Sequence, residues 1–140
     1  MDRQIATLFG IGHLRPGPGT WASLVTLAVG WRAVVRYTAA MTDRDRPEIV
    51  VDEMAGQLIA LCATSAGFWS AGLPREAFPW PGLVAPFLFF RLFDIWKPWL
   101  VGRADRRTDA AGVMLDDVWA GVFAAVASIA AAGFYHAVLM

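Results

Sequence analysis

The chain has 140 residues, a length that corresponds to a single domain. Hydrophobic residues make up 57% of it and its mean hydropathy is +0.48, whereas soluble globular proteins are usually about 45–50% apolar, so the composition favours a membrane protein. The 12 basic and 12 acidic residues cancel, which leaves no net charge to attract nucleic acid. Cys62 is the only cysteine, so an intramolecular disulfide is excluded.

The N-terminal segment leads into the Gly/Pro-rich sequence RPGPGT at residues 15–20. We expect no cleaved signal peptide, because no small-residue cleavage site precedes Arg15. An apolar segment follows over residues 21–35, but it is short and Arg32 interrupts it. We therefore expect it to lie in the membrane interface, or to re-enter from one side, rather than to cross the membrane.

Three longer apolar segments fit membrane-spanning helices, since about 20 apolar residues cross a hydrocarbon core of about 30 Å. They extend over residues 49–73, 78–100 and 113–140, and the prolines of the second are expected to bend its early turns. The sequence therefore predicts an all-α fold. It is a polytopic integral membrane helical bundle of about three spans plus the short N-terminal interfacial or re-entrant segment, in one domain over residues 1–140. The alternative is a soluble α-helical protein that buries these segments.

Arginine placement orients the predicted spans. The links over residues 36–48 and 102–112 are rich in arginine, whereas the turn at 74–76 holds only one. Because basic residues accumulate in cytoplasmic links, both arginine-rich links are predicted to face the cytoplasm, with the C-terminus on the outer side.

Small residues recur every four positions in the last apolar segment, at Ala120, Ala124, Ser128 and Ala132. Such a ridge lets helix backbones approach closely in a membrane. It predicts close packing either within the subunit or against a second copy of the chain, as a homo-oligomer.

Three groups of ionisable residues lie where the spans meet the predicted cytoplasmic face. They are Asp52 and Glu53; Arg91, Asp94 and Lys97; and Asp116 and Asp117. A charge at the centre of a membrane helix costs at least about 2.5–3.5 kcal/mol, so grouped charges of both signs usually pair or bind a ligand. Separately, the acidic pairs could favour a helix dipole, and Arg91 and Asp94 could form a structural ion pair. Together they favour a functional site.

Several carboxylates beside one arginine and one lysine suit phosphate chemistry. Mg²⁺ prefers oxygen ligands and is commonly held by a few carboxylates and a substrate phosphate. Arginine and lysine then neutralise the remaining phosphate oxygens. The PGPGT turn could offer backbone N–H groups to an anion, although a helix start capped by Thr20 is the simpler interpretation.

The chain resembles the phosphatidylglycerophosphatase A family of bacterial membrane lipid phosphatases. The matching stretches are PGPGTWASL (16–24), EIVVDEMAGQLIAL (48–61), FRLFDIWKPWLVGRADRR (90–107) and AGVMLDDVWAGV (111–122). The resemblance implies Mg²⁺-dependent removal of the terminal phosphate from phosphatidylglycerophosphate, a membrane phospholipid, to give phosphatidylglycerol. It also implies a multi-pass protein of the bacterial cytoplasmic (inner) membrane with its active site facing the cytoplasm.

The resemblance also carries over site residues, whose roles we infer from their chemistry. Asp52, Glu53, Asp116 and Asp117 are expected to bind the metal. Asp94 and Asp117, with Arg91 and Lys97, are expected to be catalytic, and the two cations also bind phosphate. Gly19, Thr20 and Ser23 are expected to bind substrate. The attacking group is either a metal-bound water or a carboxylate.

The chain departs from the family pattern between its first two motifs. Residues 31–48 are shorter than the resemblance implies by about one span, roughly 20 residues. A single crossing by residues 21–35 would put Thr20 on the opposite side from Asp52, which is why we favour a segment that does not cross. The shortening also suggests an alternative function, a catalytically impaired relative that acts as a membrane interaction or scaffold subunit. A small ion channel or transporter is disfavoured, because the charges gather at one end of the spans.

Overall fold

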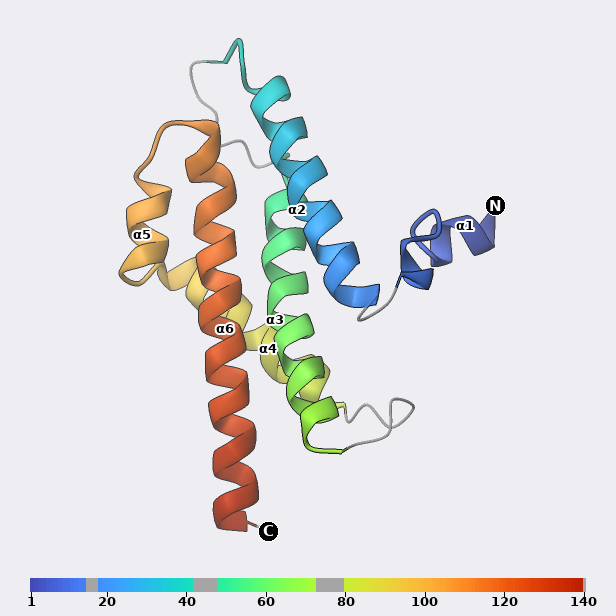
Figure 1. The fold of residues 1–140 in the computed structure, drawn as a ribbon. Coiled ribbons are helices and arrows are strands. Elements are labelled where there is room, and N and C mark those ends of the chain that lie inside the picture. The colour runs from blue at the N-terminus through green and yellow to red at the C-terminus, as the bar shows by residue number, and fades with distance from the viewer. Residues whose placement is uncertain (15–17, 42–47, 73–79, 140) are drawn as a thin grey trace.

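The computed structural model of the chain describes residues 1–14, 18–41, 48–72 and 80–139. All the regular elements of these residues are helices, which confirms the all-α prediction (Figure 1). They are α1 (Asp2–Ala6), the 3-10 helix η1 (Ile11–His13), α2 (Pro18–Tyr37), α3 (Val51–Ser70), α4 (Pro81–Trp96), α5 (Leu100–Asp105) and α6 (Ala110–Leu139).

The longest helix, α6, is the centre of the bundle. It packs against α3, α4 and α5 and also touches α2, while α4 crosses the other long helices obliquely (Figure 1). The C-terminal part of α6 extends beyond the other helices, and α1 lies to one side of the bundle. The first residues of α3 and α6 and the last of α4 are thereby brought towards the same end.

Glycine allows the closest helix contact, between α3 and α6. A Cβ atom added to Gly56 would lie 2.4 Å from the backbone oxygen of Asp117, and one added to Gly121 would lie 2.3 Å from the backbone oxygen of Gly56. Such distances are far below van der Waals contact, so neither position accepts a side chain without a shift of the backbone.

The small-residue ridge of α6 continues this contact inside the subunit. Ala120, Ala124 and Ser128 are all buried in the single chain, and the two alanines join Ala60 and Phe90 in one core cluster. A second cluster, which includes Val34, Ala55 and Met114, joins α2, α3 and α6. Packing within the subunit therefore accounts for these three positions of the ridge.

Residues 21–35 pack along the bundle as part of a longer helix. They belong to α2, a continuous helix of 20 residues, about 30 Å long, which does not have the combination of length and apolar composition of a candidate membrane span, so the expected interfacial or re-entrant path stays a prediction. The helix runs antiparallel to α3: a Cβ on Gly30 would lie 2.9 Å from Val51 at the start of α3, and Ser23 contacts Cys62 in its second half. Apolar packing along α3 outweighs the interruption by Arg32, because the Arg32 side chain is exposed.

The second expected span, residues 78–100, is not one helix, because its described part is divided between α4 and the start of α5. Residues 73–79 lie outside the described part, and α4 ends at Trp96 because Lys97 takes a left-handed conformation with φ 50° and Pro98 follows. Pro81 occupies the first turn, where no N–H is required, and the helix continues through Pro86. Among the described helices, one segment, Ala110–Val138 of α6, is long and apolar enough to cross a membrane by length and composition.

Candidate active site

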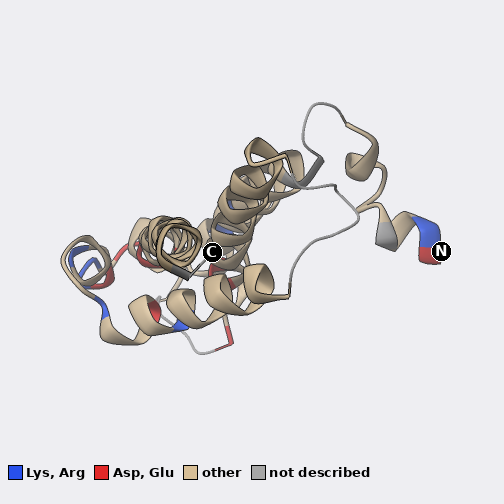
Figure 2. Ribbon diagram, turned by 90° about the horizontal axis from the view of Figure 1, so that it is seen from below, with Lys and Arg blue, Asp and Glu red and all other residues tan. Residues whose placement is uncertain are grey.

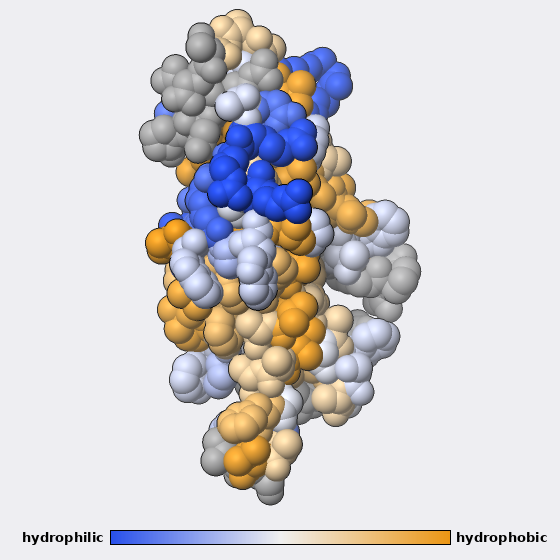
Figure 3. Space-filling view, turned by 90° about the vertical axis from the view of Figure 1, so that its left-hand side faces the viewer, coloured by the Kyte–Doolittle hydropathy of each residue, from blue (hydrophilic) through white to orange (hydrophobic). Residues whose placement is uncertain are grey.

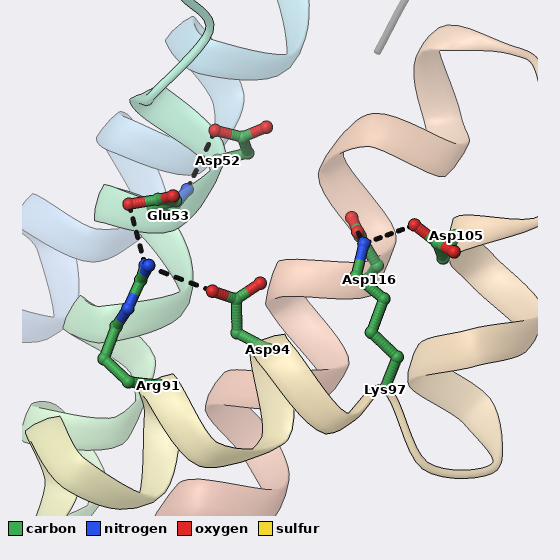
Figure 4. A network of polar contacts seen from close by, with 7 residues as sticks. All are labelled: Asp52, Glu53, Arg91, Asp94, Lys97, Asp105 and Asp116. Atoms are coloured by element: carbon green, nitrogen blue, oxygen red, sulfur yellow. Dashed lines mark hydrogen bonds and ion pairs between the residues drawn. The ribbon is translucent and has the colours of Figure 1, made fainter. Parts of the chain in front are cut away.

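The ionisable residues predicted from the sequence come together at one end of the bundle. Asp52 and Glu53 lie in the first turn of α3, Arg91 and Asp94 in the last turns of α4, and Asp116 in the second turn of α6 (Figure 4). Seen from below, charged residues lie on α3, α4, α5 and α6 where these helices approach one another (Figure 2). Three separate segments of the sequence therefore contribute to a single cluster.

Arg91 joins α3 to α4. Its Nη1 atom lies 3.0 Å from Oε2 of Glu53 and 3.1 Å from Oδ2 of Asp94 (Figure 4). The Arg91 and Glu53 side chains are both partly exposed, so the pair is accessible from solvent. The ion pair between Arg91 and Asp94 agrees with the structural role that the sequence suggests for these two residues. Arg91 makes this pair and the contact to Glu53 of α3 at the same time.

Lys97 joins the end of α4 to α5 and α6. Its Nζ atom bonds to Asp105 and lies 3.3 Å from Oδ2 of Asp116 (Figure 4). Gly102 holds the turn closed, because a Cβ there would lie 2.5 Å from the Lys97 backbone oxygen. The sequence pattern does not indicate this role for Asp105, because its link is rich in arginine and Asp105 is eight residues from Lys97.

The carboxylates of α6 retain unused acceptors. Oδ1 of Asp116 and Oδ1 of Asp117 are buried and have no hydrogen-bond partner among the described residues. Asp117 interacts electrostatically with Asp116, Asp52, Asp94 and Glu53, so its carboxylate lies among the other four. Asp52 is buried, and its Oδ1 accepts the Glu53 backbone N–H, at 2.9 Å. Buried carboxyl oxygens without partners favour the binding of a cation or a proton donor.

The donor set suits a hard cation, although the side chains do not form a preassembled cage. In the described part of the chain, no group of three or more His, Cys, Asp or Glu residues is arranged to hold a metal ion. Mg²⁺ commonly uses only one or two protein carboxylates together with water and substrate phosphate. The partnerless oxygens of Asp116 and Asp117 meet that smaller requirement.

The structure does not bring the first motif to this cluster. Gly19 and Thr20 lie in the first turn of α2, and the Ser23 hydroxyl lies 3.1 Å from Sγ of Cys62. Cys62 is ten residues after Asp52 on α3, a separation of about 15 Å along the helix. Because α2 runs antiparallel to α3, Thr20 lies still further from Asp52.

A separate ion pair lies outside the cluster, before α6. Arg107 Nη2 lies 2.7 Å from Oδ2 of Asp109, and the guanidinium lowers the pKa of that exposed carboxyl to about 2. Asp109 also accepts the Gly112 N–H at 3.0 Å, so it caps the start of α6. This acidic residue offers a control for variants of the cluster.

Comparison with known sequences places the chain among the lipid phosphatases, and it is an enzyme of that class. The profile of the family described as Phosphatidylglycerophosphatase A matches residues 24–132, more than half of the chain. The chain belongs to this family, which confirms the resemblance inferred from its motifs.

Individual relatives agree with this assignment. A Haemophilus influenzae protein named phosphatidylglycerophosphatase A is 30% identical over 146 residues, covering 87% of this chain and 83% of the relative. The Escherichia coli K12 protein of the same name is 38% identical over 82 residues, covering 58% and 41%. A Bacteroides thetaiotaomicron protein with the provisional name phosphatidylinositol-3-phosphatase is 37% identical over 145 residues, covering 85% and 86%. No solved structure is significantly similar to the chain.

Proposed function

We propose that this enzyme hydrolyses the terminal phosphate of phosphatidylglycerophosphate to give phosphatidylglycerol, in a Mg²⁺-dependent reaction at the cytoplasmic face of a bacterial inner membrane. The substrate follows from the names of two relatives. The observation that carries the proposal is the convergence of Arg91, Lys97 and the carboxylates of α3, α4 and α6 at one end of the bundle.

Arg91 and Lys97 are suited to receive the phosphate. Each cation contacts two carboxylates from different segments, so each is held in place before substrate binds. A phosphate group offers more acceptor oxygens than a carboxylate and can take a bidentate arginine contact. Exchange of Glu53 for a phosphate oxygen would leave Asp94 to orient Arg91.

The acidic residues provide a place for Mg²⁺. Asp116 and Asp117, with their free oxygens, would hold the ion together with Asp52 and Glu53. Bound there, Mg²⁺ would offset the negative charge that the phosphate brings among five carboxylates. The fit depends on the oxygen-only donor set and on the two partnerless acceptors.

The reaction itself requires little from the protein beyond position and charge. A bond forms between a water oxygen and phosphorus, the bond from phosphorus to the terminal glycerol oxygen breaks, and that oxygen leaves as a hydroxyl after it gains a proton. Arg91 and Lys97 stabilise the phosphate oxygens as charge develops. Asp94 and Asp117, which interact with each other within the cluster, would orient the attacking water or take its proton.

We also propose that α3, α4 and α6 each cross the membrane. Besides the apolar α6, the outer face of α4 exposes large apolar side chains, including Leu83, Phe87, Leu88 and Leu92. Contiguous apolar surface of this kind is unusual on soluble proteins and suits contact with lipid. The space-filling view has its strongly hydrophilic surface towards the end that carries α5, and mostly apolar surface beyond it (Figure 3).

Phosphate release from purified protein tests the activity. Wild-type protein in mixed micelles should release phosphate from phosphatidylglycerophosphate in the presence of Mg²⁺. It should lose that activity when EDTA removes the metal. Asp117→Asn should abolish release, whereas Asp109→Asn should retain it because asparagine still caps α6. No release by well-folded wild type would instead support the catalytically impaired scaffold. Phosphatidylinositol 3-phosphate belongs in the same assay, because one relative is named for it.

A further inference from the structure

A groove runs between α3 and α4 from the charged cluster towards the apolar part of the bundle. Its upper part, with a volume of about 450 Å³, is lined by the polar side chains of Glu53, Gln57 and Arg91 and by the apolar Val50, Met54, Phe87 and Phe90. Its lower part, of about 340 Å³, is lined by Gln57, Leu61, Leu83, Val84 and Phe87. The two parts share Gln57 and Phe87, so they form one continuous groove.

The groove changes from charged to apolar along its length. On α3, Glu53, Gln57 and Leu61 follow at intervals of four residues, so they share a face and step about 6 Å each along the helix. On α4, Arg91 at the upper end is followed downwards by Phe87 and then Val84. The order is therefore an ion pair, an amide and then mainly apolar side chains.

The amide at the middle level lacks a partner. Both Nε2 and Oε1 of Gln57 are buried and make no hydrogen bond with any described residue. Packing does not require an amide between apolar neighbours, and an unpaired amide is costly in such a place. Its position fits a ligand that has polar groups about one helical turn away from its charged end.

We propose that this groove binds the glycerol backbone and one acyl chain of the phospholipid substrate. It rests on the proposed function, because the lipid phosphate is placed at Arg91. The ester region then lies level with Gln57, whose amide rotates to bond an ester oxygen, and the acyl chain lies against Leu61, Leu83 and Val84.

The polarity of the groove selects this occupant over a second protein chain. A phospholipid has the same sequence of groups as the groove: a phosphate, then ester oxygens, then hydrocarbon. The lower part also opens beside the exposed apolar face of α4, where Leu83, Val84 and Phe87 are themselves exposed. A lipid can therefore enter sideways from the hydrocarbon of a membrane, with no need for its chain to cross water.

Photolabelling tests the groove without reference to turnover. The probe is phosphatidylglycerophosphate with a diazirine midway along one acyl chain, and the labelled residues are mapped by mass spectrometry. Label is expected on Leu61 and on residues 83–87, and an excess of unlabelled phosphatidylglycerophosphate, but not phosphatidylcholine, should suppress it. Label on Leu92 and Ile95, which face outwards, should resist both competitors. Equal competition at all positions would overturn the proposal.

A blocked groove supplies the matching kinetic test. Val84→Trp fills the lower part, and Leu88→Trp, on the exposed face of the same helix, is its control. We expect Val84→Trp to lower kcat/KM about tenfold for the dioleoyl substrate, as displacement of about two buried methylene groups would. Turnover of the deacylated headgroup, glycerophosphoglycerophosphate, should stay unchanged, and Leu88→Trp should change neither value.

The outcomes separate the groove from the activity. If Val84→Trp lowered kcat/KM equally for both substrates, or did not lower it for the dioleoyl substrate, the acyl subsite would be overturned. Phosphate release by the wild type would still support the phosphatase activity. Competable labelling of the groove in a protein that releases no phosphate would support the subsite and refute the proposed reaction.

Discussion

Gly56 of α3 and Gly121 of α6 meet backbone to backbone, and the contact lies directly beneath the charged cluster. A Cβ on Gly121 would lie 2.3 Å from the Gly56 oxygen, and one on Gly56 would lie 2.4 Å from the oxygen of Asp117. Asp52 lies one turn before Gly56, and Asp117 one turn before Gly121. The separation of the two acidic pairs is therefore set by the absence of two side chains.

Gly56→Ala should push α3 away from α6. We expect a loss of about 1–3 kcal/mol in unfolding free energy, typical of overpacking, and a larger relative loss of phosphatase activity. Thermal unfolding in detergent and the phosphate assay measure the two effects. Gly67→Ala is the matched control on the same helix, because its Cβ would lie 4.0 Å from Ile129. That control should be neutral or slightly stabilising, and a similar penalty in both variants would contradict the role of the glycine contact.

Arg91→Ala should leave the cluster folded but remove one phosphate ligand. Loss of a charge-stabilising donor typically lowers kcat by about 10²–10³-fold, and we expect a loss of that size. Arg91→Lys should recover only part of it, because lysine has no planar fork. The exposed Arg103 provides the control. Its replacement by alanine should change kcat less than twofold, because solvent and salt screen an exposed charge. Equal kinetics for Arg91→Ala and Arg103→Ala would remove Arg91 from the site.

Asp105 is expected to position Lys97. Asp105→Asn removes the charge that holds Lys97 from the α5 side and leaves Asp116 as its charged partner, so Lys97 should be drawn towards Asp116. We expect KM to rise several-fold, because one charged contact to the phosphate is weakened. The change in kcat should be smaller. Asp105→Glu should restore the wild-type KM, which a loss of general stability would not allow. Unchanged KM in Asp105→Asn would show that this ion pair is only structural.

Much of the cluster could be predicted from sequence because it depends on local order. When consecutive apolar helices reverse direction, charges at their matching ends must lie on the same side. This rule predicts that Asp52, Arg91 and Asp116 lie in one cluster, as they do. Asp105 could not be found in this way, because its contact with Lys97 depends on a left-handed residue and a proline turn. Gln57 was missed too, although a single amide one turn after Glu53 in an apolar run is a signal.

The packing of α2 was harder to predict for a different reason. Its charge at Arg32 indicates only that it is a poor membrane span, and its packing depends on contacts with distant residues such as Val51 and Cys62. Such contacts come from shape, notably the absence of a side chain at Gly30, and not from periodicity. The roles expected for Thr20 and Ser23 therefore stay predictions carried by the family motif alone.

Thr20→Ala provides a direct test of that motif. Because Thr20 lies in the first turn of α2, at the end away from Asp52, we expect kcat/KM to change less than about twofold, a free-energy effect of about 0.4 kcal/mol. Ser23→Ala should affect stability more than activity, since Ser23 is buried against α3. A loss of more than about tenfold in Thr20→Ala, with unfolding unchanged, would mean that α2 is placed differently in the active enzyme.

Cysteine labelling should establish which ends of the helices share a side of the membrane. In a Cys62→Ala background, cysteine is introduced at Thr108, before α6, or at Ala71, after α3; both positions are exposed. If α3, α4 and α6 each cross, a membrane-impermeant maleimide should label Ala71→Cys in intact spheroplasts and Thr108→Cys only after lysis. The arginines near Thr108 favour this orientation, because basic links are retained in the cytoplasm. Labelling of both positions in intact spheroplasts would rule out the crossing of α4, which is the proposed span between them. Labelling of Thr108→Cys alone would reverse the proposed orientation and place the charged cluster outside the cytoplasm.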